Sequence, residues 1–376
     1  MLEAVVFDFD GVIIDTEWSA FEIWNQLFAE HGTELTLDEF VRSIGTRGAI
    51  DFSALITEKT GRPAPNNRAL RAWKQPLQDA AVADLALMPG VASWLQATSD
   101  AQIRTAIASS SERWWIEPHL ERHAIAHHFE HLSTWDGPDV GFSPKPAPDL
   151  YTRCLAALGI HPSAAVAIED SINGTVAAKR AGMSVIAVPT RLTAHLDFAI
   201  ADVVVSSLAE LDLHRAIAAL SNTPTVRITD YDAPAAAALA LAQQAELAAR
   251  WDDDPPCGAG GHADEYRGVD GRFLVVDVDG ADVACGGLRR HDVTTGEVKR
   301  VYVTPSARGR GLSRKVMAHL VLAARDLGYE RLILETGDRL PEAISLYESS
   351  GWTRIANFGE YADSPDSRCY ELRLLA

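Results

Sequence analysis

The stretch MLEAVVFDFDGVIIDTE, residues 1–17, decides the fold of the first half of the chain. Its apolar run ends in two aspartates, Asp8 and Asp10, followed by a glycine. Because side chains alternate along a strand, both carboxylates lie on one face at the end of that strand. In open α/β sheets, ligands bind at the carboxyl ends of the strands. The stretch therefore predicts a buried parallel strand that carries two carboxylates to a site, although DxDG alone also fits a simple turn.

Other polar residues follow later apolar runs in the same way. Ser109 ends RTAIAS, Lys145 stands between prolines in SPKPAPDLY, and AVAIED ends in Glu169 and Asp170. These residues should meet the two aspartates, since parallel strands end at one edge of their sheet. Together they would supply a nucleophile, an acid/base, an oxygen donor, a cation and metal carboxylates, which are the parts that phosphoryl transfer needs.

Four segments carry a resemblance to a known family. VVFDFDGVIIDTE, IASSS, KPAPDLY and IEDSINGTVAAKRAGM resemble the ordered motifs of the haloacid dehalogenase superfamily, in the branch of phosphatases and β-phosphoglucomutase that has a helical cap. The resemblance covers residues 2–220. It implies an α/β fold with a Rossmann-like parallel-sheet core, residues 1–15 and 88–220, and an inserted helical cap, residues 16–87.

The resemblance also implies a role for each matched residue. Asp8 would attack phosphorus to give an aspartyl-phosphate, and Asp10 would protonate the leaving alcohol and then activate water. Ser109 would hydrogen-bond the phosphoryl group, and Lys145 would neutralise its charge. The implied Mg²⁺ ligands are Asp8, Asp10 through its backbone carbonyl, Asp170 and Glu169, and such oxygen ligands suit this cation.

Details of the first half favour a phosphatase over a mutase. The mutase pattern has a histidine after the DT hinge and a lysine after the second motif, whereas this chain has DTEWSAFEIW and, after the serines, Glu112 and Arg113. Gly45 and Arg47 in the cap segment IGTRG are candidates for binding the substrate, and a solvated arginine is the alternative. Trp114 and Trp115 are expected to be packing residues of the helix that follows the second motif.

A second domain is predicted to follow SNTPT, residues 221–225, where a helical pattern stops at small polar residues and a proline. In residues 226–376 the segment EVKRVYVTPSARGRGLSRKVMAHLV, residues 297–321, indicates a strand, a glycine-rich turn and a helix. Backbone amides at such a helix start form an anion site suited to a pyrophosphate, here reinforced by Arg308 and Arg310.

RGRGLS and AISLYESSGW resemble the acetyl-CoA loop and the following helix of the GNAT family of N-acetyltransferases. The resemblance implies a mixed α+β domain in which Tyr347 protonates the departing thiolate. Glu297 is a candidate base for the acceptor amine, and an exposed glutamate at the start of a strand is the alternative. The implied acetyl-CoA contacts are Val301 and Val303 for the pantetheine arm, and Arg308, Gly309, Arg310, Gly311 and Ser313 for the phosphates. Ser313 departs from the usual glycine or alanine.

The composition of the chain excludes some classes of partner and indicates a cellular compartment. The 376 residues carry a formal net charge of −18 without a basic stripe, so nucleic acid is not an expected partner. No apolar run approaches the ~20 residues of a membrane span. Four cysteines without CxxC spacing indicate reduced thiols in a cytoplasmic protein.

The expected function is therefore a bifunctional enzyme. It combines a Mg²⁺-dependent phosphatase for a small phosphorylated metabolite with an acetyl-CoA-dependent N-acetyltransferase for a small amine. One alternative is a phosphatase, or a phosphoglucomutase-like mutase, whose C-terminal domain binds CoA or regulates without catalysing. Another is an enzyme that loads a phosphorylated acid onto a carrier protein.

Overall fold

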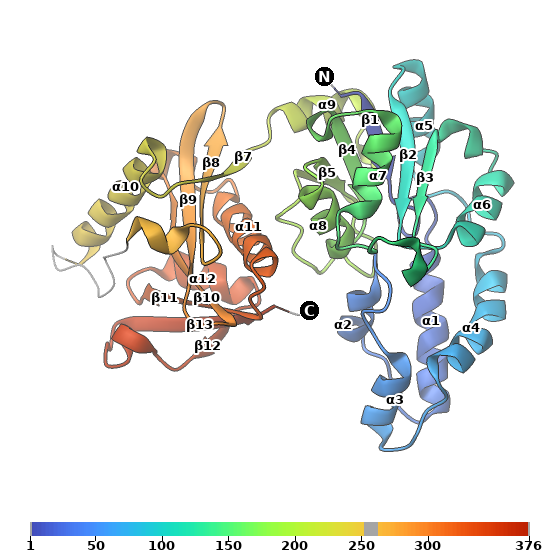
Figure 1. The fold of residues 1–376 in the computed structure, drawn as a ribbon, viewed down its shortest axis with the longest axis horizontal. Coiled ribbons are helices and arrows are strands. Elements are labelled where there is room, and N and C mark those ends of the chain that lie inside the picture. Colours follow the sequence, from blue (N-terminus) through green and yellow to red (C-terminus); the bar gives the residue numbers. More distant parts are fainter. Residues whose placement is uncertain (1, 252–261, 375–376) are drawn as a thin grey trace. The chain divides into compact units, whose positions relative to one another are not determined.

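The computed structural model describes residues 2–251 and 262–374. The chain divides into two compact units, Met1–Ser221 and Asn222–Ala376 (Figure 1). Within the described residues, no helix combines the length and the apolar character that crossing a bilayer requires. Cys154, Cys285 and Cys369 are buried free thiols, and Cys257 lies outside the described residues.

The first unit is built on a parallel sheet. Its strands are β1 (Ala4–Phe7), β2 (Arg104–Ser109), β3 (His131–Thr134), β4 (Ala165–Glu169), β5 (Ser184–Ala187) and β6 (Val203–Val204). Their spatial order is β3-β2-β1-β4-β5-β6, and β1 pairs in parallel with both β2 and β4. The chain adds β2 and β3 on one side of β1 and then β4, β5 and β6 on the other side. The strand order therefore reverses at β1, and such folds bind ligands at this switch point. The predicted Rossmann-like core is confirmed.

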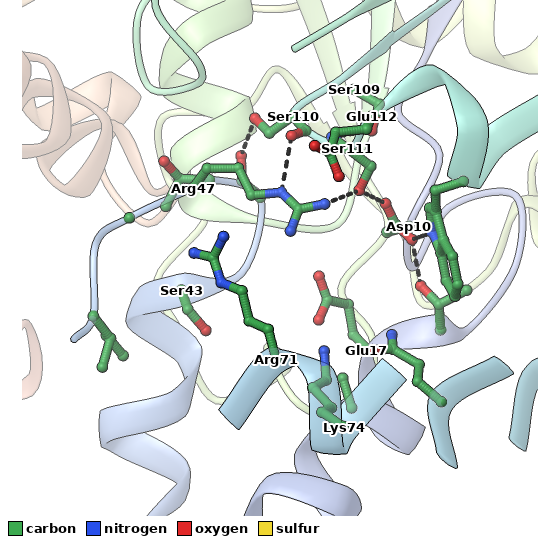
Figure 2. Close-up of a pocket in the computed structure, with 18 of the residues that line it drawn as sticks. Asp10, Glu17, Ser43, Arg47, Arg71, Lys74, Ser109, Ser110, Ser111 and Glu112 are labelled. Carbon is green, nitrogen blue, oxygen red and sulfur yellow. Dashed lines mark hydrogen bonds between the residues drawn. The ribbon is translucent and has the colours of Figure 1, made fainter. Parts of the chain in front are cut away.

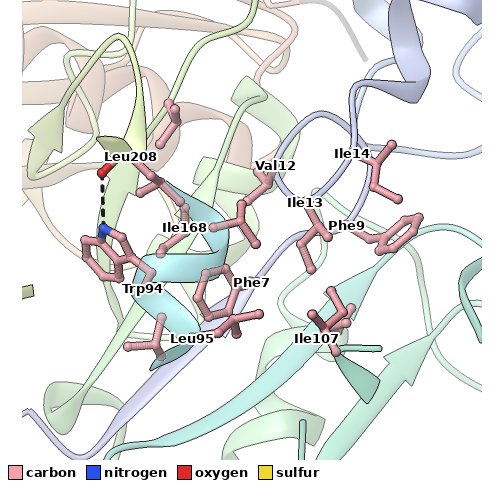
Figure 3. Packing of buried hydrophobic residues seen from close by; sticks show 14 of the residues in the cluster. Phe7, Phe9, Val12, Ile13, Ile14, Trp94, Leu95, Ile107, Ile168 and Leu208 are labelled. Carbon is pink, nitrogen blue, oxygen red and sulfur yellow. Dashed lines mark hydrogen bonds between the residues drawn. The ribbon is translucent and has the colours of Figure 1, made fainter. Parts of the chain in front are cut away.

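Helices cover both faces of this sheet. They are α5 (Val91–Asp100), α6 (Arg113–Arg122), α7 (Asp149–Leu158), α8 (Ile172–Arg180) and α9 (Leu213–Ser221). Val5 and Phe7 pack with residues of α5, α6 and α9, whereas Ala4 and Val6 pack with residues of α7 and α8. The first strand is thus apolar throughout because both of its faces are buried. In Figure 3, Phe7 lies in this core near Trp94, whose indole Nε1 donates to the Leu208 carbonyl at 3.3 Å.

The segment between β1 and α5 folds as a helical cap. It contains α1 (Thr16–Glu30), α2 (Leu37–Phe40), α3 (Phe52–Thr60) and α4 (Asn67–Val82). Residues 16–87 are all described by the structure, and none of them forms a strand. The cap has its own apolar core, in which the rings of Trp24 and Phe52 stack at 4.0 Å. The Thr36 hydroxyl and the Glu39 carboxylate form a capping box that starts α2. The predicted cap is therefore an independently packed layer.

The second unit is a mixed sheet with helices, as predicted. Its strands are β7 (Thr225–Thr229), β8 (Arg272–Val278), β9 (Ala281–Arg290), β10 (Thr295–Val303), β11 (Arg331–Gly337), β12 (Thr353–Ile355) and β13 (Ser367–Arg373), and its helices are α10 (Pro234–Arg250), α11 (Leu312–Asp326) and α12 (Pro341–Ser349). The spatial order is β12-β13-β11-β10-β9-β8-β7. Of these strand pairs, β10 and β11 run parallel and the others run antiparallel.

Strand β10 changes partner along its length. It pairs with β11 only over residues 295–298, and its pairing with β9 contains a bulge between Lys299 and Tyr302. Arg300 within this bulge has a φ of 60°. One extra residue moves the following side chains to the other face of the sheet. Val301 and Val303 therefore face the side opposite to Glu297.

Candidate active sites

The carboxyl ends of β1 and β4 hold a buried ion-pair chain. The Lys145 Nζ lies 2.5 Å from Asp8 Oδ1 and 2.5 Å from Glu169 Oε1, and the lysine side chain is fully buried. Burial alone would lower the pKa of Lys145, but the two carboxylates raise it above its ordinary value. The ammonium group therefore remains charged beside Asp8, as the sequence predicted for a group that neutralises a phosphoryl.

Glu169 is held by further donors. The Tyr151 hydroxyl donates to its Oε1 at 2.6 Å, and the Ser171 hydroxyl donates to its Oε2 at 3.0 Å. A Cβ at Gly174 would lie 1.8 Å from Glu169 Oε1, so only glycine leaves room for this carboxylate. Glu169 is thus placed to orient Lys145, with both of its oxygens engaged.

Asp170 differs from Glu169 because neither of its oxygens has a partner. Both oxygens are buried and accept no hydrogen bond from any described residue. Burial raises the pKa of Asp170, and the neighbouring carboxylates of Asp8 and Glu169 raise it further. Oxygens of these three residues lie within 4.8 Å of one another. Gly11, with a φ of 85°, lets the backbone approach, since a Cβ there would lie 2.0 Å from Asp170 Oδ2.

The Asp10 carboxylate lies in the same cavity and accepts three hydrogen bonds. Its Oδ1 accepts from the Thr16 hydroxyl at 2.6 Å and from Trp115 Nε1 at 3.0 Å, and its Oδ2 accepts from the Ser111 hydroxyl at 2.6 Å. The prediction that Trp115 is a packing residue is confirmed by its place in the apolar core, and its indole in addition contacts a site carboxylate, whereas the same prediction for Trp114 is wrong because that side chain is 55% exposed. Sequence reasoning missed Thr16 and Trp115 as donors, while Ser111 belongs to the serine run whose hydroxyls were expected at the site.

The cavity above these residues has a volume of about 210 Å³ and is lined by core and cap residues, among them Asp8, Asp10, Ser109, Gly45 and Arg47. Both predicted cap residues connect the cap to the core. The Gly45 carbonyl accepts from the Ser110 hydroxyl at 3.0 Å. Arg47 donates from Nε to the Ser110 carbonyl at 3.1 Å and from Nη2 to Ser111 Oγ at 3.2 Å (Figure 2). The Arg47 guanidinium is therefore engaged at the site and not merely solvated.

The cap adds charged residues that sequence reasoning did not single out. Arg71 and Lys74, one helical turn apart on α4, point into the cavity together with Glu17 (Figure 2). Neither cation forms an ion pair within the described part of the chain. Burial raises the pKa of Glu17 to about 7 and lowers that of Lys74 to about 8. Their spacing of three residues on an otherwise polar helix was the available signal.

A second cavity, with a volume of about 270 Å³, lies in the second unit. The predicted acetyl-CoA contacts that line it are Val301, Val303, Arg308, Gly309, Gly311, Ser313 and Tyr347. Gly309 and Gly311 have φ values of 76° and 74°, which the turn before α11 requires and other residues rarely adopt. Burial raises the pKa of Tyr347, so its phenol holds its proton at neutral pH.

Two predicted residues do not line this cavity. Arg310 is exposed and is not among the residues that line it. Glu297 is 2% exposed, and its Oε2 accepts from Arg289 Nε at 2.8 Å, so the alternative of an exposed glutamate is wrong. The bulge in β10 is the physical reason that Glu297 faces away from Val301 and Val303. Glu246 of α10, which the sequence did not suggest, lies in the cavity and pairs with Arg308 at 2.5 Å.

Comparisons with known proteins agree with this two-part architecture. Residues 5–188 match the family described as haloacid dehalogenase-like hydrolase, and residues 240–352 match the acetyltransferase (GNAT) family. The first half is 34% identical over 213 residues to the putative phosphatase YhcW of Bacillus subtilis, which covers 57% of this chain and 95% of that protein. The chain belongs to the haloacid dehalogenase-like hydrolases.

The chain is similar to other members as well. It is 34% identical over 218 residues to protein CbbY of Cereibacter sphaeroides, a match that covers 56% of this chain and 94% of that protein. The structure of β-phosphoglucomutase from Clostridium difficile has a TM-score of 0.50 at 21% identity, covers 59% of this chain and 98% of its own, and shows a shared fold alone. A GNAT domain follows the hydrolase domain in the same chain.

Proposed function

We propose that the first unit is a Mg²⁺-dependent phosphatase for a small phosphorylated metabolite and that the second transfers an acetyl group from acetyl-CoA to a small amine. The observation that carries the phosphatase proposal is the buried chain Asp8–Lys145–Glu169 beside the unpartnered Asp170. A nucleophilic carboxylate, a fixed cation and free metal-binding oxygens at one strand edge are suited to phosphoryl transfer.

The charges of the site favour a bound dication. Three carboxylates, Asp8, Glu169 and Asp170, share one ammonium group, that of Lys145, so full ionisation would leave two negative charges uncompensated. Burial and the neighbouring carboxylates accordingly raise the pKa values of Asp8 and Asp170. Unpaired buried charge is costly, and a hard cation with oxygen ligands would compensate it. Asp8, Asp170 and the backbone carbonyl of Asp10 would hold Mg²⁺, which would neutralise charge on the phosphoryl oxygens.

The residues of the chain then divide the chemistry between them. Asp8 Oδ attacks phosphorus, and Lys145 and the Ser109 hydroxyl stabilise the charge on the transferring group. Asp10 gives a proton to the leaving oxygen and then removes one from the water that hydrolyses the aspartyl-phosphate. The cap closes the cavity through Arg47 and excludes bulk water from the intermediate.

The cap end of the cavity supports a substrate with a second anionic group. Arg71 and Lys74 present positive charge on the side of the cavity away from the strand edge (Figure 2). Glu17 beside them can accept hydrogen bonds from hydroxyls of the same substrate. A cavity of about 210 Å³ fits a small metabolite, such as a sugar bisphosphate or a phosphorylated sugar acid.

Lys74 should make the KM for such a substrate depend on pH. Its pKa is lowered to about 8 by burial, so the ammonium group is present below that pH and is lost above it. We expect the KM for a sugar bisphosphate to rise by up to about tenfold per pH unit above the pKa, with a smaller rise for a sugar monophosphate. The measurement is KM against pH for both substrates.

Lys74→Arg is the control for this prediction, because arginine keeps its charge over the whole range. Its KM should stay flat through the pH at which the KM of the wild type rises. An identical rise in both proteins would show that another group is responsible and that Lys74 does not bind the substrate.

The acetyltransferase proposal is supported by the second cavity. Val301 and Val303 line this cavity beyond the point at which β10 leaves β11, where their backbone would meet a pantetheine arm. Their carbonyls now accept from Gln243 Nε2 and Arg308 Nε, each at 3.1 Å, and a pantetheine arm would replace these donors. The amides at the start of α11 would hold the pyrophosphate, with Arg308, Gly309, Gly311 and Ser313 around them. Tyr347 in the same cavity would protonate the CoA thiolate as it leaves.

Tyr347→Phe should lower the kcat of acetyl transfer by about 100-fold and leave CoA affinity unchanged, since only the proton donor is lost. Tyr370→Phe is the matched control, because its ring lies 5.9 Å from that of Tyr347 but does not line the cavity. The measurements are acetyl-CoA consumption over a panel of amines and calorimetric CoA binding. Binding without transfer by the wild type over the whole panel would favour a domain that binds CoA without catalysing.

The experiment that tests both halves is phosphate release from phosphorylated sugars, amino-sugars and small acids with Mg²⁺, run with and without acetyl-CoA. An amino-sugar phosphate that is hydrolysed and whose product consumes acetyl-CoA would support a shared pathway. If the protein hydrolyses none of these esters, the phosphatase proposal is contradicted, and the mutase and carrier-loading alternatives are favoured instead.

A further inference from the structure

The two oxygens of Asp10 have different surroundings. Oδ1 accepts from both Thr16 and Trp115, whereas Oδ2 accepts from Ser111 alone. A carboxylate oxygen has about two lone-pair sites. Oδ1 is therefore fully occupied, and Oδ2 keeps one site for a further partner.

The three donors also differ in chemistry. The hydroxyls of Thr16 and Ser111 can rotate and can either donate or accept a hydrogen bond, but the Trp115 indole can only donate. An oxygen that faces Trp115 must therefore act as an acceptor at every stage of a reaction. The indole thus allows one orientation of the Asp10 carboxylate, in which Oδ1 faces α6.

Ser111 shows where the other oxygen lies. Its hydroxyl oxygen accepts from Arg47 Nη2 at 3.2 Å while its proton goes to Asp10 Oδ2 at 2.6 Å (Figure 2). Asp10, Ser111 and Arg47 all line the cavity, so the lone pair that Oδ2 keeps is open to it, whereas both sites of Oδ1 are taken by Thr16 and Trp115. The free lone pair of Oδ2 is therefore the one that a substrate can reach.

Trp115 is rigid enough to impose this orientation. Its ring is 8% exposed, belongs to the apolar core of the first unit and packs edge-on against the ring of His119 at 5.0 Å. The adjacent Trp114 is 55% exposed and donates instead to the carboxylate of Glu112 at 3.0 Å. Of these two neighbouring indoles, only that of Trp115 contacts Asp10.

We propose that Trp115 is a positioning residue that orients the Asp10 carboxylate so that Oδ2, and not Oδ1, meets the oxygen of the leaving group. The inference rests on the proposed function of Asp10 as acid and base. In the first step the Asp8–phosphorus bond forms, the ester P–O bond breaks, and the proton on Asp10 Oδ2 moves to the departing oxygen. In the second step water attacks phosphorus and gives a proton to Oδ2, while the Asp8–phosphorus bond breaks and phosphate leaves, which restores both aspartates.

The test compares two esters in the same protein preparation. A sugar or alkyl phosphate needs a proton on its leaving oxygen, whereas p-nitrophenyl phosphate releases a stable phenolate without one. A misplaced acid can cost up to about 100-fold in rate, so we expect Trp115→Phe to lower the rate for the sugar phosphate by about 10- to 100-fold. Because Oδ2 serves both esters as the base of the second step, this comparison is made on the first step, measured as release of the alcohol or the phenolate in a single turnover. The first-step rate for p-nitrophenyl phosphate and the KM for both esters should change little.

Trp114→Phe is the matched control, because it makes the same chemical change one residue away. Whatever its effect on rate, it should leave the ratio of the two first-step rates, for the sugar phosphate and for p-nitrophenyl phosphate, as in the wild type. The ratio does not depend on the folded fraction of a preparation, so a partly unfolded Trp115→Phe protein still gives a valid result. A ratio for Trp115→Phe that equals the wild-type ratio would overturn the proposal.

Asp10→Asn separates this inference from the proposed function. If Asp10→Asn lowers sugar phosphate turnover more than p-nitrophenyl phosphate turnover, Asp10 is the acid, and the Trp115→Phe ratio then decides the inference on its own. If Asp10→Asn retains wild-type turnover of both esters, the proposed role of Asp10 fails, and the inference fails with it.

Discussion

Asp8→Asn is expected to abolish phosphate release from every ester that the wild type hydrolyses. The amide of asparagine cannot replace the carboxylate that attacks phosphorus, and loss of a nucleophile costs at least about 1,000-fold in kcat. The variant should remain folded, because the substitution removes one of three buried carboxylates that share Lys145 and so lowers the electrostatic cost of the site.

Two measurements check this expectation. Phosphate release gives the loss of turnover, and the mass of the peptide around Asp8 after an acid quench reports the aspartyl-phosphate. The wild type should show a phosphorylated fraction during turnover, and Asp8→Asn should show none. A phosphorylated peptide elsewhere in the wild type, or turnover by Asp8→Asn at the wild-type rate, would refute Asp8 as the nucleophile.

The residues at strand ends could be predicted because the sequence determines them locally. A short continuous apolar run such as AVVF is typical of a strand that is buried on both faces. The polar residue that follows such a run lies at the end of the strand, and therefore at the edge of the sheet where the strands end. Asp8, Ser109, Glu169 and Asp170 were found in this way. The short strands β3 and β6 were missed because four and two residues carry too little pattern to separate them from loops.

The partners of the site residues could not be predicted, because they come from distant parts of the chain. Trp115 reaches Asp10 across 105 positions, and nothing in its own neighbourhood distinguishes it from Trp114. The hydroxyls of Tyr151 and Ser171, which donate to the two Glu169 oxygens, were likewise not predicted, and Glu169 still belongs to the group of three carboxylates that could hold a metal ion. Which side chain donates to a site carboxylate depends on tertiary packing, and packing brings Trp115 and not Trp114 to Asp10.

Glu297 shows a second reason why the sequence does not predict the whole site, namely an irregular strand. Without a bulge, residues 297, 299, 301 and 303 of one strand would share a face, and the glutamate would then lie beside the acetyl-CoA contacts. The extra residue at Arg300 moves Glu297 to the other face. No turn residue marks this bulge in EVKRVYV, so the sequence pattern gives no sign of it.

Asp170→Asn is expected to stabilise the metal-free protein while it abolishes Mg²⁺-dependent turnover. Without a cation, Asp170 holds two buried oxygens that accept no hydrogen bond from the described residues, close to two further carboxylates. An amide removes this charge at nearly the same size. The amide leaves polar atoms at the same buried place, but it ends the repulsion from the carboxylates of Asp8 and Glu169, and its NH2 group can donate to them. A hydrogen bond to a charged group contributes about 1.5–3 kcal/mol, so the free energy of unfolding of the first unit in EDTA should rise by about that amount.

Mg²⁺ should reverse this order of stability. A ligand at about 100 times its Kd stabilises the native state by about 2.7 kcal/mol, so wild type should gain this stability on adding Mg²⁺, whereas Asp170→Asn should gain little. Denaturant unfolding of the full chain, with and without Mg²⁺, measures both quantities on the transition that responds to the metal. Asp139→Asn, an exposed aspartate outside the site, is the control and should match the wild type in both conditions. An Asp170→Asn protein that is less stable than wild type in EDTA would mean that the Asp170 carboxylate stabilises the metal-free fold. The charge argument for a bound dication would then fail, even if turnover were lost.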